Sequence, residues 1–274
     1  MVKPSAAKPK KGQATGPAQA GYLLFLSRHQ VRNLAELVVD TQRAGGVVDP
    51  KEAKRRANTA HSVDMALFGR MVADMTDINV DACAQVAHAL SVHAVDNEFD
   101  YFTAVDDKAP DDNAGAGMIG TVEFNSSTLY RYATLNVEAL RTALGDDEVA
   151  ARAVTAFVTA FITSMPTGKQ NTFANRTLPD AVLVQLRTTQ PVNLVGAFET
   201  AVEAGSGSGR IAEAARRLAA HSADLDRAFG STPRGSWVVA VGQARESLAP
   251  AGQDIDLAGL LERVAGAVAV PQPA

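Results

Sequence analysis

The sequence contains one cysteine, Cys83, among its 274 residues. A single thiol forms no disulfide within the chain and excludes a zinc site built from several cysteines. Long apolar runs are missing as well: no stretch of about eighteen apolar residues is present, so no membrane-spanning helix is expected. The first twenty residues are basic but lack the apolar segment of a secretory signal. These absences favour a cytoplasmic protein.

Acidic residues are absent from the first eleven positions, where Lys3, Lys8, Lys10 and Lys11 are the charged residues. The whole chain has 26 basic and 30 acidic residues and a formal net charge of −4, so 22 basic and 30 acidic residues remain beyond those four lysines. The composition is therefore not that of a protein that binds nucleic acid through bulk basicity. Any nucleic acid must be held by a local basic surface.

Apolar residues make up 46% of the chain and charged residues 20%, which is ordinary for a globular protein. Period-3.6 patterns predict helices, and period-2 or β-branched runs predict strands. One helix is predicted to follow Ser27 and a second to begin at Pro50. Further predicted helices cover residues 137–144, 146–164, 194–202, 211–229 and 257–268. The predicted strands cover residues 21–26, 63–71, 84–95, 128–135, 181–186 and 237–241. This order predicts an α+β protein with helices packed on one face of a sheet.

The first helix carries a capping box, because Gln30 stands three residues after Ser27. Its predicted apolar face consists of Val31, Leu34, Ala35 and Val38. The short second helix, KEAKRRAN, is rich in Lys and Arg. It is either a solvated face or a nucleic-acid contact.

Residues 94–121 are predicted to be a loop between two β-type runs. A loop of this length in a compact domain is usually functional or disordered. Aromatic residues stand near its start, at Tyr101 and Phe102. A base can stack on such a ring, or the ring can anchor the loop to the core, and the residues alone leave these alternatives open.

Two glycine motifs suggest nucleotide binding only weakly. Residues 115–120, GAGMIG, match G-x-G-x-x-G, but a dinucleotide site needs a strand before the motif and a helix after it. Here an Asp-rich loop precedes and a strand, TVEF, is expected to follow, which favours a tight return into a strand. Gly168-Lys169 resembles the end of a P-loop, but the first glycine is replaced by Thr163 and the final Ser/Thr by Gln170. No nucleotide hydrolysis is expected from it.

The loop after Pro166 concentrates hydrogen-bond donors and two cations without an acid. Its polar members are Lys169, Gln170, Asn171, Thr172, Asn175 and Arg176. Such a set suits phosphate and sugar oxygens, although an ordinary polar loop remains the alternative.

Catalysis is not expected. His88 and His93 have opposite strand parity, so they do not converge on a metal, and a buried or hydrogen-bonded role is predicted. The Asp cluster over residues 106–112 lacks the spacing of a calcium loop. The sequence shows no Ser-His-Asp or paired-carboxylate arrangement, and we expect no cofactor.

Several long segments resemble the CasC family, the backbone subunit of the type I-E CRISPR surveillance complex, Cascade. They lie in the same order between about Leu23 and Ala201, and weaker similarity continues to the C-terminus. The segments are VDMALFGRM, QVAHALSVH, FDYFTAVDD, GAGMIGTVEFNSSTLYRYA and PTGKQNTFANRTLP.

The resemblance implies a hand-shaped α+β protein with an RRM-like (ferredoxin-like) palm sheet, helical fingers and a long thumb loop. The expected parts are a flexible Lys-rich tail (1–20), a fingers remnant (21–62), and a palm (63–274) with the thumb at about 94–121 and C-terminal helices. Copies of the subunit are expected to polymerise along one CRISPR RNA beside other Cascade subunits in antiviral defence. Each thumb kinks the RNA, and target DNA is recognised through the RNA–DNA hybrid.

The resemblance also implies RNA contacts. Residues matching Met71 and Tyr101 to Thr103 lie at the RNA kinks, and the loop matching Lys169 to Thr172 lies near the RNA backbone. With neighbouring arginines included, the predicted RNA-binding residues are Arg70, Met71, Tyr101, Phe102, Thr103, Lys169, Gln170, Asn171, Thr172 and Arg176.

Two departures from the family pattern matter. The family's first palm strand and its Asn-Arg-Asp-Asp-like and Arg-x-Ser-Ser-Gln-like motifs are not found, so the chain is expected to be N-terminally truncated. Met118 stands where the family usually has histidine. The sequence thus predicts a non-catalytic, RNA-binding scaffold, with a non-functional remnant or an oxidoreductase using GAGMIG as alternatives.

Overall fold

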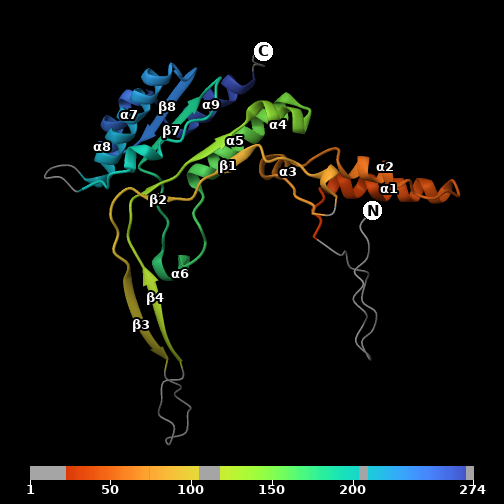
Figure 1. Ribbon diagram of the computed structural model, residues 1–274, viewed down its shortest axis with the longest axis horizontal. Helices are drawn as coiled ribbons and strands as arrows, with labels where there is room; N and C mark the ends of the chain where they lie inside the picture. The colour runs from red at the N-terminus through yellow and green to blue at the C-terminus, as the bar shows by residue number, and fades with distance from the viewer. Residues whose placement is uncertain (1–22, 74, 105–117, 204–208, 270–274) are drawn as a thin grey trace, which may run out of the picture. The chain divides into compact units, whose positions relative to one another are not determined.

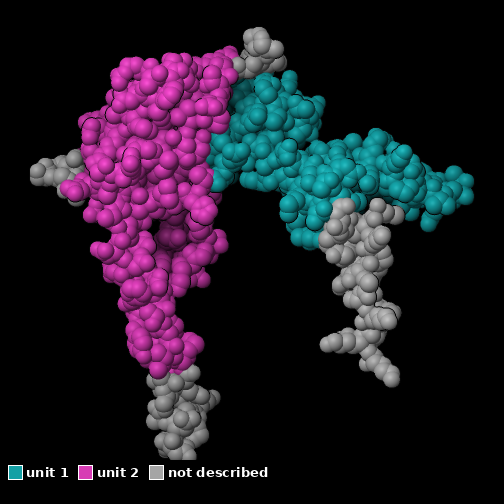
Figure 2. Space-filling view, viewed as in Figure 1, with its two compact units in different colours: residues 1–86, 133–161, 261–274 teal, residues 87–132, 162–260 magenta. Residues whose placement is uncertain are grey.

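The computed structural model describes residues 23–73, 75–104, 118–203 and 209–269 (Figure 1). Contacts divide the chain into two compact units (Figure 2). Unit 1 comprises residues 1–86, 133–161 and 261–274, and unit 2 comprises residues 87–132 and 162–260. Helices and small sheets are mixed, so the predicted α+β class is confirmed. None of the described helices is long and apolar enough to cross a bilayer.

Unit 1 begins with the helices α1 (Arg28–Arg43), α2 (Pro50–Ala57) and α3 (Val63–Phe68), followed by a 3-10 turn, η1 (Thr76–Ile78). The strand predicted over residues 63–71 is wrong. The segment forms α3 because Asp64 lies in its first turn and Gly69 ends it at a φ of 78°. A Cβ on Gly69 would lie 2.7 Å from the Val80 carbonyl oxygen, so a glycine is required there. The predicted strand at 21–26 is also wrong in its described part, residues 23–26.

The predicted capping box of α1 is present, with the Ser27 and Gln30 side chains each accepting the other's backbone N–H. The predicted apolar face lies along one side of α1, but its members Val31 and Val38 are exposed. Gln30 and Leu37 are buried instead. The Gln30 amide belongs to a buried polar cluster with Arg70.

The rest of unit 1 packs helices beside a two-stranded sheet. Strand β1 (Ala84–Val86) pairs antiparallel with β6 (Ala133–Leu135), and α4 (Val137–Leu144) follows. Asp146 then caps α5 (Asp147–Thr163) by accepting the Val149 N–H. The last helix, α9 (Leu257–Ala269), lies in unit 1 from residue 261 onward, where the buried Arg141 guanidinium of α4 donates to the Val268 carbonyl.

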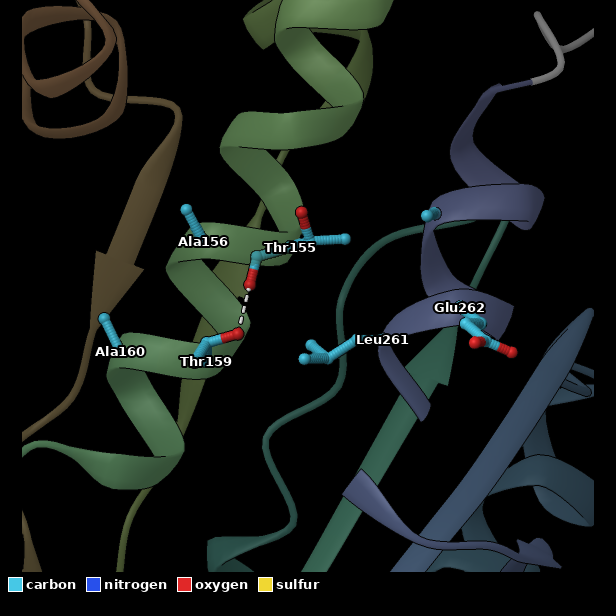
Figure 3. A pocket seen from close by; sticks show the side chains of 7 residues that line it. Thr155, Ala156, Thr159, Ala160, Leu261 and Glu262 are labelled. Carbon is cyan, nitrogen blue, oxygen red and sulfur yellow. Dashed lines mark hydrogen bonds between the residues drawn. The ribbon is translucent and has the colours of Figure 1, made fainter. Parts of the chain in front are cut away.

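An open apolar groove of about 630 Å³ lies between α5 and α9 within unit 1 (Figure 3). Small and apolar side chains dominate its lining, and the Thr159 hydroxyl donates to the Thr155 carbonyl rather than into the groove. The lining residues are Thr155, Ala156, Thr159, Ala160, Leu261, Glu262 and Ala265. None of the predicted RNA-binding residues lines it.

Unit 2 is built on a three-stranded sheet in the order β7 (Ala181–Leu186), β8 (Gly235–Ala240), β9 (Gln253–Asp254). Strand β8 pairs antiparallel with β7 and parallel with β9. The helices α7 (Arg210–Phe229) and α8 (Gly242–Leu248) pack on this sheet, and 3-10 turns lie at η2 (Val195–Phe198) and η3 (Ala249–Ala251). The shared core consists of Ala215, Ala219, Val238, Ala244 and Leu248.

Two antiparallel pairs complete unit 2: β2 (Leu90–Ser91) with β5 (Leu129–Tyr130), and β3 (Glu98–Ala104) with β4 (Met118–Phe124). The strand predicted over residues 84–95 is therefore interrupted, because β1 and β2 pair with different partners. The short helix predicted over residues 194–202 is reduced to η2. A further short helix, α6 (Gln170–Phe173), was predicted as loop.

Candidate nucleic-acid interface

Most of the described part of the predicted thumb loop, residues 94–104 and 118–121, forms a pair of β-strands, the β3–β4 hairpin, where the sequence predicts a loop. Strands β3 and β4 pair in register from Glu98 with Phe124 to Ala104 with Met118. Aromatic and β-branched residues such as Tyr101 and Ile119 favour strands and pair well across them. All seven residues of β3 are exposed. The strand predicted after GAGMIG is confirmed as β4, and its place is where a dinucleotide site needs a helix.

The hairpin has two apolar faces because strand side chains alternate. Phe102 shares one face with the β4 residues Met118, Val122 and Phe124. Tyr101 lies on the other face. The predicted contact residues therefore form two separate surfaces, with Phe102 on one and Tyr101 and Thr103 on the other.

His93 links the two segments of the chain that lead into and out of the hairpin, at the base of the hairpin. Its Nε2 accepts the Thr128 N–H at 3.0 Å, so its Nδ1 carries the proton and donates to the Ala94 carbonyl at 2.7 Å. The Val92 N–H donates to the Thr128 carbonyl beside it. The prediction of a buried or hydrogen-bonded histidine is confirmed for His93, which is buried, but not for His88, which is exposed.

Tyr130 anchors the root of the hairpin to the rest of unit 2. Its hydroxyl donates to Asn193 Oδ1 at 2.9 Å and accepts the Leu194 N–H at 3.1 Å. Its ring packs against Phe198 with 5.2 Å between the centroids. Burial is the main cause that raises the pKa of Tyr130 to about 12, so the hydroxyl stays protonated at neutral pH. The hairpin thus projects from a fixed base.

Helix α6 adjoins the base of the hairpin (Figure 1). The rings of Phe124 on β4 and Phe173 on α6 lie 6.0 Å apart. Because Phe124 and Phe102 share a face, α6 borders the Phe102 face of the hairpin. Four residues of strand separate Phe124 from Gly120, the partner of Phe102, which corresponds to about 13 Å. Phe173, which was not predicted as a site residue, links the two parts.

The predicted donor loop gathers around α6. Lys169 precedes the helix with its ammonium 6.0 Å from the centroid of the Phe173 ring, and it makes no ion pair with a described acid. Arg176 donates to Gln170 Oε1 at 3.0 Å, which brings it to the same loop. Asn171 and Thr172 are exposed on α6. The structure therefore places all five predicted loop residues together.

Backbone strain marks this loop. Three described residues other than glycine have a positive φ, and two of them, Lys169 (60°) and Ala174 (49°), flank α6. Such residues are held only where the surroundings enforce them, and they cluster at binding sites. The Oδ1 atom of Asn175 is buried without a hydrogen-bond partner, which leaves an acceptor free within the loop.

Charge and apolar surface are divided between the two parts of the interface. The described residues of the hairpin include Glu98, Asp100 and Glu123 and no cation. The cations Lys169 and Arg176 lie in the α6 loop. The hairpin is therefore suited to apolar contact, and the loop to an anionic backbone.

Arg70 is not placed as an exposed RNA contact. It is 5% exposed, and burial lowers its pKa while leaving the group protonated. All five of its N–H groups are used inside unit 1, at 2.6 to 3.3 Å from their acceptors. These are the carbonyl oxygens of Phe25, Ala57 and Ile78, Gln30 Oε1 and Asn58 Oδ1. The guanidinium therefore has a structural role, which the sequence does not reveal because its acceptors come from several separate segments between Phe25 and Ile78.

Met71, next to Arg70, is 82% exposed. Both residues belong to unit 1, whereas the other predicted RNA-binding residues belong to unit 2. The Asp cluster at 106–112, the first three residues of GAGMIG and the tail at 1–20 lie outside the described residues.

Known structures similar to this chain include components of CRISPR complexes. One chain of "CRISPR RNA-guided surveillance complex, pre-nicking" is 29% identical, with a TM-score of 0.81 over 95% of this chain and 73% of that one. One chain of "CRISPR RNA-guided surveillance complex" is 31% identical, with a TM-score of 0.66 over 88% of this chain and 85% of that one. No curated protein matches the sequence.

The model of one protein family, described as CT1975-like protein, matches residues 2–262. This range covers unit 2, most of unit 1 and the complete candidate interface. The chain therefore belongs to the CT1975-like protein family.

Proposed function

We propose that this protein is an RNA-binding backbone subunit of a CRISPR surveillance complex of the Cascade type. The observation that carries the proposal is its likeness, over 95% of its length, to a chain of a CRISPR RNA-guided surveillance complex. The proposal extends to a type I-E complex with an RRM-like palm, in which copies of this chain polymerise along the guide RNA beside other subunits in the cytoplasm. Target DNA would then be read by pairing with the guide.

The chemistry of the interface supports RNA binding without a sequence code. An aromatic ring that projects on a hairpin stacks on any base, because every base has a π face. Lys169 and Arg176 suit phosphate oxygens, which carry no sequence information. In this proposal the Phe102 face of the hairpin turns one base out of the stack, and the α6 loop holds the backbone on either side of it.

The proposed role requires no chemical step by the protein. Stacking, charge and shape hold the RNA, so we propose that the chain is not an enzyme. Incubation of the purified chain with labelled RNA and DNA in the presence of divalent cations tests this, and the strands should stay intact. Cleavage that disappears on mutation of one carboxylate would contradict the proposal.

The test of the binding role compares two exposed phenylalanines of unit 2. Phe102 is 37% exposed on the hairpin, and Phe229 is 77% exposed at the end of α7. Neither fills the core, so Phe102→Ala and Phe229→Ala should both spare folding, well short of the roughly 3–5 kcal/mol that a buried phenylalanine costs. Phe102→Ala alone should weaken assembly on the guide RNA, by about 1–3 kcal/mol per site.

The experiment expresses the full chain with a guide RNA and the other complex subunits, and measures the RNA that co-purifies and the melting temperature of each variant. Cooperative melting also tests whether the chain is a non-functional remnant. A wild-type chain that folds but carries no guide RNA would refute the proposed function. Equal RNA content in the two variants would remove Phe102 from the interface.

A further inference from the structure

Gly120 lies directly opposite Phe102 in the register of the hairpin. A Cβ atom built on Gly120 would lie 2.6 Å from the Cζ atom of Phe102, and 2.9 and 3.3 Å from its two Cε atoms. Contacts under 3.0 Å are not tolerated by real Cβ atoms. The outer end of the Phe102 ring therefore lies against the Gly120 backbone, with no room for a methyl group between them.

The backbone of Gly120 gives no other reason for a glycine at this position. Its φ lies outside the left-handed region, unlike those of Gly69 and Gly145. A glycine inside a strand lowers stability relative to a residue with a side chain. A ring laid across the glycine from the neighbouring strand offsets part of that loss. The glycine at position 120 therefore leaves space for the Phe102 ring.

The exposure of the hairpin rings agrees with this arrangement. Phe102 is 37% exposed, whereas Phe99 and Tyr101 on the other face are each 65% exposed. A ring that lies down on the opposite strand covers one of its faces and presents the other. A presented ring face is what a base needs for stacking.

We propose that Gly120 is a positioning residue that holds the Phe102 ring flat across β4, so that one ring face meets the base turned out of the guide RNA. This inference rests on the proposed function of Phe102. A side chain at position 120 displaces the ring, and a displaced ring must be reordered on binding, which weakens the complex. Gly120 acts through Phe102 and contacts no base itself.

The test is a double-mutant cycle in the full chain with a single-stranded RNA that carries 2-aminopurine, whose fluorescence rises when the base leaves the stack. The variants are Gly120→Ala, Phe102→Ala and the double variant. The control is Gly266→Ala, because a Cβ there meets nothing within 4 Å. Affinity is measured at one fixed salt concentration.

We expect Phe102→Ala to lower the RNA affinity by about 5- to 150-fold. Gly120→Ala should lower the affinity by at most the same factor and should also reduce the fluorescence rise. Gly266→Ala should bind normally. In the Phe102→Ala background, Gly120→Ala should cause no further loss, because the ring through which it acts is gone. If Gly120→Ala alone fails to fold, restored folding in the double variant supports the same contact.

Three results would overturn the inference. The first is an equal loss from Gly120→Ala with and without the Phe102 ring. The second is normal binding by Gly120→Ala while Phe102→Ala binds weakly, which leaves the proposed function of Phe102 intact. The third is a double variant that is as unfolded as Gly120→Ala. Normal binding by Phe102→Ala would instead refute the contact of Phe102 with RNA, and the positioning role with it.

Discussion

Replacement of Arg70 by methionine should destabilise the protein and leave RNA contacts in place. Methionine fills similar space without any N–H group, so the acceptors around Arg70 lose their donors. The carbonyl oxygens of Ala57 and Ile78 accept buried hydrogen bonds from the Arg70 guanidinium. Each buried acceptor left without a partner costs about 1–3 kcal/mol, so these two alone predict a loss of about 2–6 kcal/mol. This is a large part of the 5–15 kcal/mol that typically stabilises a domain.

Denaturant unfolding of Arg70→Met should show this loss, and Arg152→Met is the control. Arg152 also lies in unit 1, but its side chain is 70% exposed and forms a 3.8 Å ion pair with Glu148. Such a pair contributes about 0–1 kcal/mol, so the control should unfold almost as the wild type does. Wild-type stability in Arg70→Met, together with weaker and less salt-dependent RNA binding, would refute the structural role. Arg70 would then face the RNA, as the sequence predicts.

Further predictions concern the α6 loop and two titrating groups. Lys169→Ala should weaken binding to all RNA sequences alike and reduce the salt slope by about one phosphate contact, and an unchanged slope in filter binding would exclude Lys169. Burial, and then the charge of Arg70, lowers the pKa of His61. Its contribution to stability is therefore complete above pH ~6.5 and is lost as the pH falls below it, because the unfolded chain takes up the proton first. Melting temperatures between pH 7.5 and 5.5 should fall less in His61→Gln, and parallel curves would contradict this. The pKa of Tyr130 is raised, so stability should be lost as the pH rises from ~10 to ~12, and Tyr130→Phe should remove that decline in unfolding experiments.

The parts of the fold that were predicted correctly are those with local causes. The long helices α5, α7 and α9 have sustained period-3.6 patterns, and Asp146 and the Ser27 capping box supply their own hydrogen bonds. Strands β7 and β8 are apolar runs bounded by turns. In each case the signal lies within about twenty residues of sequence.

The errors arise where contacts between separate segments of the chain determine the structure. No sequence pattern shows that the carbonyl oxygens of Phe25, Ala57 and Ile78 accept hydrogen bonds from Arg70, which the sequence analysis predicts as an RNA contact. The same cluster includes the buried Gln30, whereas Val31 is exposed, against the apolar pattern of α1. Pairing of β3 with β4 places Tyr101 and Phe102 on opposite faces, which adjacency in a supposed loop does not reveal.

The most direct test of the RNA-binding interface is cross-linking of a guide RNA containing 4-thiouridine to the assembled full chain, followed by mapping of the cross-linked residues. We predict cross-links on the Phe102 face of the hairpin and in the α6 loop, at Phe102, Met118 and the residues from Lys169 to Arg176. Cross-links confined to other surfaces, with none in the hairpin or the loop, would contradict the proposed interface.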